Sequence, residues 1–383
     1  MTDAPDYAAG FGPFDGRIWL NCSHQGPIPR VAADAARDAI AVKQAPFRLV
    51  EPGIFQEVPR RLRTSLARLI NVAADDVILG NSTTYGLSLF VRGLEWHRGD
   101  EVLVVDGDFP AVLFPWLALR DQGVTIRKLT PRGAMVTAED LAAELRPNTR
   151  VFCTTWVHSF RGSMVDVPSL AAACRANGTL FALNASQGMG TRPFDAAASG
   201  VDLVTSCGFK YLCGPYGTGF CWIRPDVRHA LRPPQSYWLA NLTADDLAGS
   251  FREELKPDVG ARAFDVFGTA NFFNFQAWNA SVEYLLAAGL ERIHTWDQSL
   301  VSRLIEGISS DRRWTISSPT AGPSRTTIVV FSAETPEQTS AAFQALREKG
   351  IFVAMRRGNI RVSPHLYNVA ADIDAALGVL ART

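Results

Sequence analysis

This sequence of 383 residues has no excess of positive or negative charge, because 38 Lys and Arg residues balance 38 Asp and Glu residues. A neutral balance gives no reason to expect a nucleic acid or an anionic membrane surface as a partner. No run of apolar residues reaches the ~20 residues that a membrane-spanning helix needs. Residues 1–16 lack the basic and then apolar pattern of a secretory signal. We therefore expect a cytoplasmic protein that binds neither nucleic acid nor membranes.

Cysteine is scarce, and no two of the six cysteines have the spacing Cys-x-x-Cys. Several of them fall in apolar stretches, which indicates reduced core residues rather than disulfides. The six histidines form no cluster with them at ligand spacing, so we expect no metal site. The cysteines are Cys22, Cys153, Cys174, Cys207, Cys213 and Cys221.

Apolar residues are abundant, at 47% of the chain, which is enough for a large core and for two domains. Short apolar strands alternate with helical stretches up to about Arg252. These strands are apolar at consecutive positions, which indicates burial on both faces and a parallel sheet covered by helices. The clearest expected strands are residues 101–106, 150–155, 180–183 and 203–206.

The pattern changes after Arg252. We expect a long helix at residues 275–288 and then a smaller α+β unit. The expected elements of this unit are strands at 326–331 and 352–362, a helix at 336–349 and a last helix at 370–380. Ligands of open α/β sheets bind beyond the carboxyl ends of the strands, which is where the candidate residues below fall.

Lys210 is the residue that most clearly indicates chemistry. It follows an apolar strand at residues 201–205 and precedes a turn rich in Gly and Pro, which leads into a second apolar strand at 220–223. A lysine between two buried strands loses solvation, which lowers its pKa toward that of a nucleophilic amine. Covalent catalysis by a carbonyl cofactor needs such an amine. The alternative is an ordinary surface lysine in a turn.

Polar side chains mark three further places. Ser82, Thr83 and Thr84 open an apolar helix, and hydroxyls with free N–H groups at a helix start form either an anion site or a plain N-cap. Asn184 and Gln187 end a buried strand, where amides need partners, either backbone groups or a polar heterocycle. A guanidinium in the apolar strand around Arg361 needs a planar anion, which is either a ligand carboxylate or an internal salt bridge.

Taken in this order, these segments resemble the class V aminotransferase family of pyridoxal-phosphate (PLP) enzymes, from Trp19 to Leu377. The family includes isopenicillin N epimerase-like proteins, cysteine desulfurases and kynureninases. The resemblance implies an α/β fold, the PLP-dependent transferase fold type I, with a mostly parallel sheet in a large domain and a small C-terminal α+β domain. The implied parts are an N-terminal segment that closes over the site (1–30), a large PLP-binding domain (31–255) and a small domain (256–383).

The resemblance also implies roles for single residues. Lys210 matches the catalytic lysine that binds pyridoxal 5'-phosphate covalently, and Phe109 matches the aromatic residue that stacks on its ring. Thr269 matches a residue that reaches the phosphate of the partner subunit, which implies a homodimer with shared active sites. The implied cofactor-binding residues are Ser82, Thr83, Thr84, Phe109, Asn184, Gln187, Cys207 and Thr269. The implied substrate-binding residues are Arg361, as a clamp on the α-carboxylate, with Asn21, His24, Trp156 and His158.

The sequence departs from the family pattern at several positions. Asn184 stands where the family usually has an aspartate that keeps the pyridine nitrogen protonated, and a neutral amide makes the ring a weaker electron sink. Phe209 replaces a polar residue before the lysine, and Cys207 stands where Ser or Thr is frequent. No cysteine follows Cys221, whereas a cysteine desulfurase needs a mobile thiol late in the chain.

These features favour a PLP enzyme that acts at the α-carbon of an amino acid. We favour a lyase-type reaction on an S-substituted cysteine or a similar amino acid, either β-elimination or decarboxylative or oxidative deamination. Similar members process cysteine S-conjugates in antibiotic pathways of the lincosamide type, which is an argument by family analogy. The alternative is an aminotransferase or epimerase, which needs a longer-lived carbanion. A further alternative is a PLP-binding protein without catalytic activity.

Overall fold

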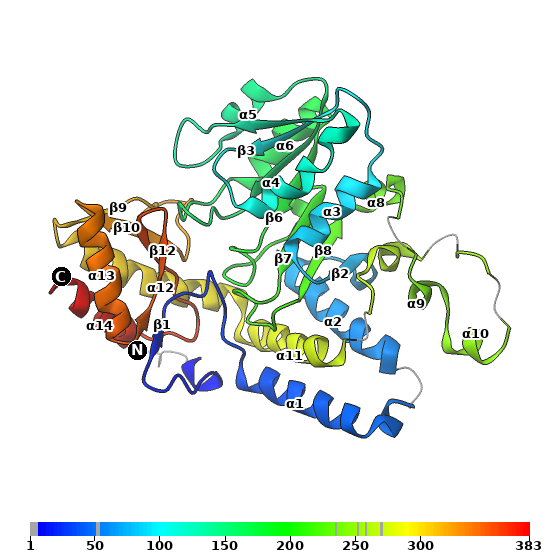
Figure 1. The fold of residues 1–383 in the computed structure, drawn as a ribbon, viewed down its shortest axis with the longest axis horizontal. Coiled ribbons are helices and arrows are strands. Elements are labelled where there is room, and N and C mark those ends of the chain that lie inside the picture. Colours follow the sequence, from blue (N-terminus) through cyan, green and yellow to red (C-terminus); the bar gives the residue numbers. More distant parts are fainter. Residues whose placement is uncertain (1–6, 51–53, 234–235, 251–252, 257–258, 269–270) are drawn as a thin grey trace.

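The computed structural model of the protein describes residues 7–50, 54–233, 236–250, 253–256, 259–268 and 271–383. A seven-stranded sheet, a four-stranded sheet and a two-stranded sheet organise these residues, and Figure 1 shows the largest one beside a smaller unit formed by the C-terminal part of the chain. In the described residues, no helix has both the length and the apolar composition to cross a membrane.

The large sheet has seven strands in the order β2-β8-β7-β6-β5-β3-β4. All neighbours are parallel except that β8 runs antiparallel to both β2 and β7, so the sheet is mostly parallel, as expected. The strands are β2 (Val77–Gly80), β3 (Glu101–Val105), β4 (Thr125–Leu129), β5 (Thr149–Thr155), β6 (Leu180–Asn184), β7 (Leu203–Cys207) and β8 (Gly219–Ile223).

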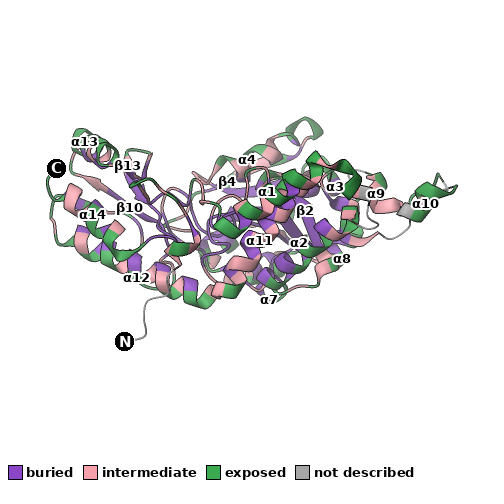
Figure 2. Cartoon of the chain, turned by 90° about the horizontal axis from the view of Figure 1, so that it is seen from below, coloured by how far each residue is buried: buried purple, intermediate pink, exposed green. Residues whose placement is uncertain are grey.

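Helices cover both faces of this sheet, which explains the continuous apolar strands. In β3, Val102 and Val104 pack with α3 and α4, whereas Leu103 and Val105 belong to the cluster that contains α2, α5, α6 and α11. Successive residues of a strand point to opposite faces, so both must be apolar. The helices are α1 (Arg30–Gln44), α2 (Ile54–Ile70), α3 (Thr83–Gly93), α4 (Pro110–Leu117), α5 (Ala138–Glu144), α6 (Val167–Asn177), α7 (Ala196–Ser199), α8 (Pro225–Ala230), α9 (Trp238–Asn241), α10 (Ala244–Ala248) and α11 (Phe272–Ala288). Figure 2 shows the buried strands inside this helical cover.

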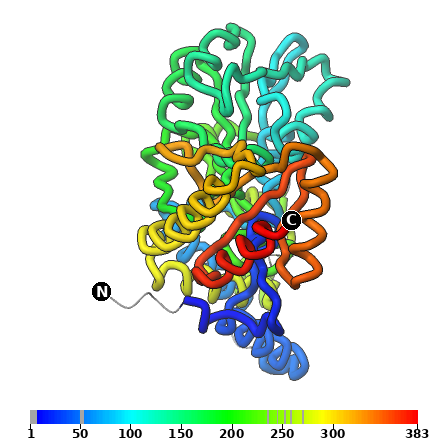
Figure 3. The backbone as a smooth tube through the Cα atoms, turned by 90° about the vertical axis from the view of Figure 1, so that its left-hand side faces the viewer, coloured from blue at the N-terminus to red at the C-terminus, as the bar shows by residue number. Residues whose placement is uncertain are grey.

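The small unit is an antiparallel sheet in the order β12-β13-β10-β9, covered by three helices. Its strands are β9 (Trp314–Ile316), β10 (Val329–Ala333), β12 (Ala354–Arg356) and β13 (Asn359–Val362), and its helices are α12 (Leu290–Ser309), α13 (Pro336–Glu348) and α14 (Ala370–Leu380). The N-terminal strand β1 (Ile18–Trp19) pairs in parallel with β11 (Ile351–Phe352). The N-terminal segment therefore lies against the C-terminal unit, as Figure 3 shows.

Most expected elements are present, with three differences. The strand expected at 352–362 is divided into β11, which pairs with β1 in another sheet, and the hairpin of β12 and β13, whose tight turn is formed by Arg357 and Gly358 with positive φ of 49° and 78°. The strand expected at 326–331 begins at Val329, and the helix α12 was not expected. The domain boundaries stay a prediction, and α11, which was expected to belong to the small domain, packs against α1 and α2 of the large one.

Candidate active site

Lys210 lies in the loop between β7 and β8, at the carboxyl end of the large sheet. Backbone hydrogen bonds fix this loop, from Gly208 N–H to Thr218 O at 2.9 Å and from Gly214 N–H to Gly208 O at 2.7 Å. The Lys210 Nζ atom is 5.3 Å from the centroid of the Phe109 ring. Burial lowers the pKa of Lys210, and the positive charge of Arg361 lowers it further. The amine is therefore more readily neutral, as a nucleophile requires.

The ring of Phe109 is held in place by the residue before it. Both carboxylate oxygens of Asp108 accept hydrogen bonds from β5: Thr155 donates its backbone N–H at 2.9 Å and its hydroxyl at 2.9 Å, and the Thr154 hydroxyl donates at 3.2 Å. Phe109 then begins α4 as its N-cap residue. Asp108 was not among the residues singled out from the sequence.

The segment 18–26 closes onto the lysine loop. The Gly26 N–H donates to Phe209 O at 2.9 Å, and a Cβ atom on Gly26 would lie only 1.9 Å from Lys210 O. The same segment is joined to the small unit, since the hydroxyls of Ser23 and Ser363 are 2.8 Å apart. Asn21 and His24 are thereby carried to the site. His24 is exposed, and its pKa is lowered, first by partial burial and then by the charges of the cationic residues nearby, Arg361 among them.

The three hydroxyl residues before α3 have different environments. The Ser82 hydroxyl accepts from Tyr85 N–H at 3.2 Å and is the N-cap of α3, and the buried Thr83 hydroxyl pairs with that of Ser186. Thr84 is exposed. Within the part of the chain that the structure describes, the backbone N–H groups of Thr83 and Thr84 donate to no acceptor. These free N–H groups can bind an anion although Ser82 caps the helix, so the segment can serve both as an N-cap and as an anion site.

Asn184 ends β6 beside the start of α3. Its Oδ1 atom accepts from Ser186 N–H at 3.1 Å, and among the described residues its amide N–H groups have no acceptor. They can donate to a ring nitrogen that carries no proton. Cys207, at the end of β7, is buried, and its N–H donates to the Ser186 hydroxyl at 3.3 Å.

Gln187 does not present a free donor. Its Nε2 atom donates to Ser23 O at 3.0 Å and to the Ser159 hydroxyl at 3.2 Å, while its buried Oε1 atom has no partner in the described structure. Its expected contact with the cofactor stays a prediction, and donation to PLP would require the side chain to exchange one of these partners.

Arg361 is a buried cation without an anion. The side chain lies in β13, is 3% exposed, and donates through Nη1 to Ser159 O at 3.0 Å and through Nη2 to the Asn21 amide oxygen at 3.5 Å. Its Nε atom has no partner, and no carboxylate of the described residues pairs with it. Burial lowers its pKa to about 10, which leaves it charged at neutral pH. The described residues hold no internal salt bridge for it, and its expected role as a clamp on a substrate carboxylate stays a prediction.

The two other residues expected to bind substrate lie in different settings. The Trp156 ring centroid lies 4.8 Å from that of Phe194, and the ring packs directly over Gly188 in the large core, so its expected substrate contact stays a prediction. His158 is buried, and its Nδ1 atom accepts N–H groups of the loop that follows, from Phe160 at 3.2 Å. Burial lowers its pKa and keeps it neutral. Thr269 lies outside the described residues.

Ser159 was missed by sequence reasoning, although it contacts both Gln187 and Arg361. A serine after a strand is too common to single out. The histidines and cysteines were also misjudged, because His365 lies in one buried cluster with Cys22 and Cys213. The reason given for expecting no metal is therefore wrong, and the absence of a metal stays a prediction.

The residues present fit a PLP molecule. A helix start with free N–H groups suits the phosphate, the Phe109 ring suits the face of the pyridine, and the free N–H groups of Asn184 suit its nitrogen. Lys210 supplies the amine that a bound aldehyde needs. The unpaired guanidinium of Arg361 suits the α-carboxylate of an amino acid.

Comparisons with known proteins agree with this arrangement. The model of the family described as aminotransferase class-V matches residues 54–376. A probable cysteine desulfurase of Methanothermobacter thermautotrophicus is 27% identical over 251 residues, which is 65% of this chain and 60% of that protein. The isopenicillin N epimerase of Streptomyces clavuligerus is 26% identical over 282 residues, which is 70% of this chain and 69% of that protein.

Solved structures show the same fold. A variant of C-DES with glycine covalently linked to its PLP cofactor superposes with a TM-score of 0.88 at 23% identity, over 98% of this chain and 99% of that one. The complex of the cystine C–S lyase C-DES with its product cysteine persulfide gives a TM-score of 0.85 at 23% identity, over 96% and 99% of the two chains. The protein therefore belongs to the aminotransferase class-V family and is a PLP-dependent enzyme.

Proposed function

We propose that this enzyme cleaves the carbon–sulfur bond of an S-substituted L-cysteine by β-elimination. Overall, the substrate and one water become a thiol, pyruvate and ammonia. PLP, when bound, supplies an aldehyde for covalent attachment and a ring that delocalises electrons from the α-carbon. The general assignment to cysteine chemistry is supported by relatives named as cysteine desulfurases and by a structural neighbour named as a cystine C–S lyase.

The environment of Asn184 is the observation that carries the choice of reaction. Its Oδ1 atom accepts from Ser186 N–H, so the amide would offer the ring nitrogen of a bound PLP a neutral N–H donor and not a carboxylate. A ring nitrogen without a proton withdraws electrons less strongly, so a carbanion at the α-carbon is short-lived. Elimination suits such a site because a thiolate leaves as soon as the electrons arrive, whereas transamination and epimerisation need a carbanion that persists until it is protonated.

The other residues of the site have separate roles in the proposed reaction. Arg361 binds the α-carboxylate and thereby orients the bond between the α-carbon and its hydrogen toward Lys210. Lys210, with its lowered pKa, takes this proton at Nζ once the amine is free. The segment 18–26, which carries Asn21 and His24, covers the site and excludes water.

The test uses the PLP-loaded enzyme with a panel of S-alkyl-L-cysteines. We expect thiol and pyruvate in equal amounts, both in air and without oxygen. Norvaline is the matched control for S-methyl-L-cysteine, because it has the same shape and no leaving group. Amino-group transfer or inversion of both compounds without thiol release would overturn the proposal in favour of an aminotransferase or epimerase, and product formation that needs oxygen would favour oxidative deamination.

A further inference from the structure

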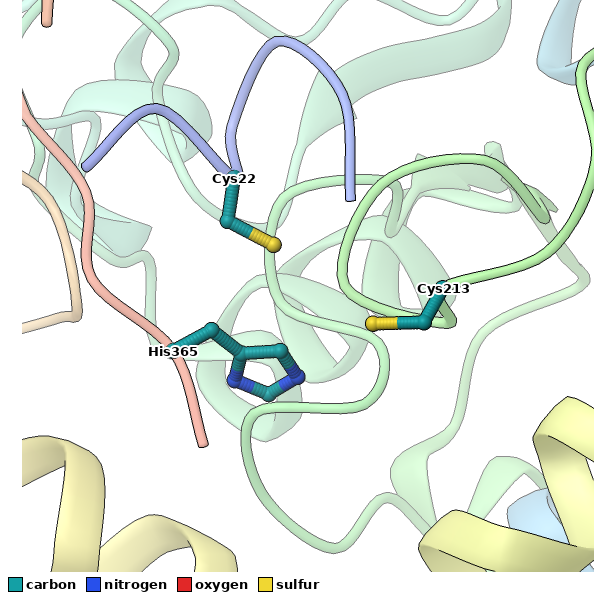
Figure 4. Close-up of side chains that lie close together, drawn as sticks. All are labelled: Cys22, Cys213 and His365. Carbon is teal, nitrogen blue, oxygen red and sulfur yellow. The ribbon is translucent and has the colours of Figure 1, made fainter. Parts of the chain in front are cut away.

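Three side chains from distant parts of the chain meet behind the lysine loop. Cys22 lies in the N-terminal segment, Cys213 follows Lys210 in the loop, and His365 follows β13. The two sulfur atoms and a ring nitrogen all lie within 4.8 Å of one another, and all three residues are fully buried. Figure 4 shows the two thiols and the imidazole directed toward a common centre. The proposed reaction uses none of them.

Both nitrogen atoms of His365 are already occupied. Nδ1 lies 2.8 Å from Oδ2 of the buried Asp297, and Nε2 lies 3.0 Å from Tyr211 O. Both partners are acceptors, so both nitrogens must carry hydrogen and the ring is an imidazolium. Burial alone would lower the pKa of His365, but Asp297 raises it to about 10. An imidazolium has no lone pair for a metal ion, so this arrangement does not favour cation binding.

The fixed positive charge acts on the nearer thiol. Burial alone would raise the pKa of Cys213, but the neighbouring Cys22 thiol and the positive charge of His365 lower it to about 6. Burial raises the pKa of Cys22, which keeps its proton. Cys213 also has a φ of 50°, a left-handed conformation that a cysteine adopts only where its surroundings enforce it. Two sulfur atoms thus lie close together, and Cys213 is the one that loses its proton more readily, which is the arrangement of a reactive cysteine with its resolving partner.

We propose that Cys213 and Cys22 form an oxidation site whose substrate is a small hydroperoxide. The Cys213 sulfur attacks one peroxide oxygen, the O–O bond breaks, and water or an alcohol leaves with a sulfenic acid on Cys213. The Cys22 sulfur then attacks the Cys213 sulfur, a second water leaves, and a Cys22–Cys213 disulfide forms. The dithiol loses two electrons and two protons, and the peroxide is reduced.

The Cys22–Cys213 disulfide would join the N-terminal segment to the lysine loop. Cys22 belongs to the segment that carries Asn21 and His24, and Cys213 belongs to the loop that carries Lys210. These two segments are otherwise joined by non-covalent contacts such as the hydrogen bond from Gly26 N–H to Phe209 O at 2.9 Å. Both sulfurs are 0% exposed, so peroxide reaches them when segment 18–26 lifts from the loop. The disulfide then locks the segment in its closed position.

The test treats the PLP-loaded enzyme with hydrogen peroxide and maps its peptides without reduction. We expect a peptide pair joined through Cys22 and Cys213, the loss of two of the six thiols, and full reversal by dithiothreitol. Cys22→Ser should leave a sulfenic acid on Cys213 that dimedone traps, whereas Cys213→Ser should form neither product. Cys174→Ser is the matched control and should keep the cross-link, because burial raises the pKa of that thiol.

The peptide map of the peroxide-treated wild-type enzyme tests the Cys22–Cys213 disulfide even if a variant folds poorly. A peroxide-treated enzyme that keeps all its thiols, or that joins other cysteines, would overturn the proposal. Dimedone labelling of Cys22 in place of Cys213 would do the same. Zinc bound in stoichiometric amount to the purified enzyme, and lost in both Cys22→Ser and Cys213→Ser, would show that the cluster is a metal site instead.

Discussion

At the scale of single residues, the position of Lys210 over Phe109 indicates where we expect PLP to bind. Lys210→Ala should remove the covalent attachment, because this is the amine that burial makes nucleophilic. Borohydride treatment followed by peptide mapping should find the cofactor on Lys210 in the wild type and on no peptide in the variant, and turnover should be lost. Lys128→Ala is the control, since Lys128 forms a surface ion pair with Asp106. A cofactor fixed to another lysine would contradict the assignment.

Arg361 combines burial with the lack of an anionic partner among the described residues. Arg361→Ala should weaken the binding of α-amino acids by roughly 2–5 kcal/mol. The variant lacks the buried guanidinium that would pair with the substrate carboxylate. The PLP content should not change. Binding constants from spectral titration check this, with Arg303→Ala as the control, since Arg303 pairs with Asp374 on the surface. An unchanged constant for substrates with an α-carboxylate would exclude the clamp.

Asn184 provides a test of how the ring partner controls the reaction. Asn184→Asp should raise the proton affinity of the ring nitrogen, and each pKa unit corresponds to about 1.4 kcal/mol. Nitrogen-15 NMR of the bound cofactor measures the protonation directly, without turnover. We expect slower thiol release and more amino-group transfer in the variant. A protonated ring nitrogen in the wild-type enzyme, or equal product ratios in both proteins, would show that Asn184 does not control the choice of reaction.

At the scale of elements, the segment 18–26 joins both units of the molecule at the site. Gly26→Ala should push this segment from the lysine loop, because the added Cβ would lie 1.9 Å from Lys210 O. We expect a loss of stability of about 1–3 kcal/mol, as for other overpacked sites, and a higher KM. Thermal unfolding and steady-state kinetics measure the two effects.

Gly133→Ala is the matched control for this change, since nothing lies within 4 Å of a Cβ atom there. Equal stability and kinetics of the two variants would mean that the closed position of segment 18–26 is not needed for the site.

At the scale of the whole molecule, we predict a homodimer. Exposed aromatic side chains gather at the start of α11, where the ring of Phe55 is 5.4 Å from Phe272 and the Asn274 amide donates to Tyr216 O at 3.3 Å. Phe55, Tyr216 and Phe273 are all exposed there, as large apolar groups at interfaces are. The phosphate contact expected of Thr269 in the partner subunit would also require such a dimer.

Tyr216→Asp together with Phe273→Asp should weaken this dimer by at least about tenfold, because a carboxylate in an apolar interface is costly. Light scattering at several protein concentrations measures the change. Phe114→Asp is the control, since Phe114 is equally exposed but lies on α4. A wild-type monomer that binds PLP fully would refute the prediction.

The sequence by itself determined the large sheet and the ends of its strands. Residues such as Val102 and Leu103 are both apolar because the two faces of a parallel strand are both covered, and this requirement is local. The positions of Lys210 and Arg361 follow from the same pattern, because a charged residue inside an apolar stretch is conspicuous. The α+β unit was less complete: α12 was not expected, although its buried apolar residues recur at helical spacing, and the turn at Arg357 and Gly358 was included in one strand.

Only the tertiary structure decided which distant side chains meet. Ser23 and Ser363 are 340 residues apart in the chain and yet share a hydrogen bond, and Cys22 reaches Cys213 and His365 by the same closure. Residue spacing carries no information about such contacts, because they depend on how the N-terminal segment lies between the two units. Only the tertiary structure also shows that no described carboxylate pairs with Arg361, because this depends on all the residues around its side chain and not on its own strand.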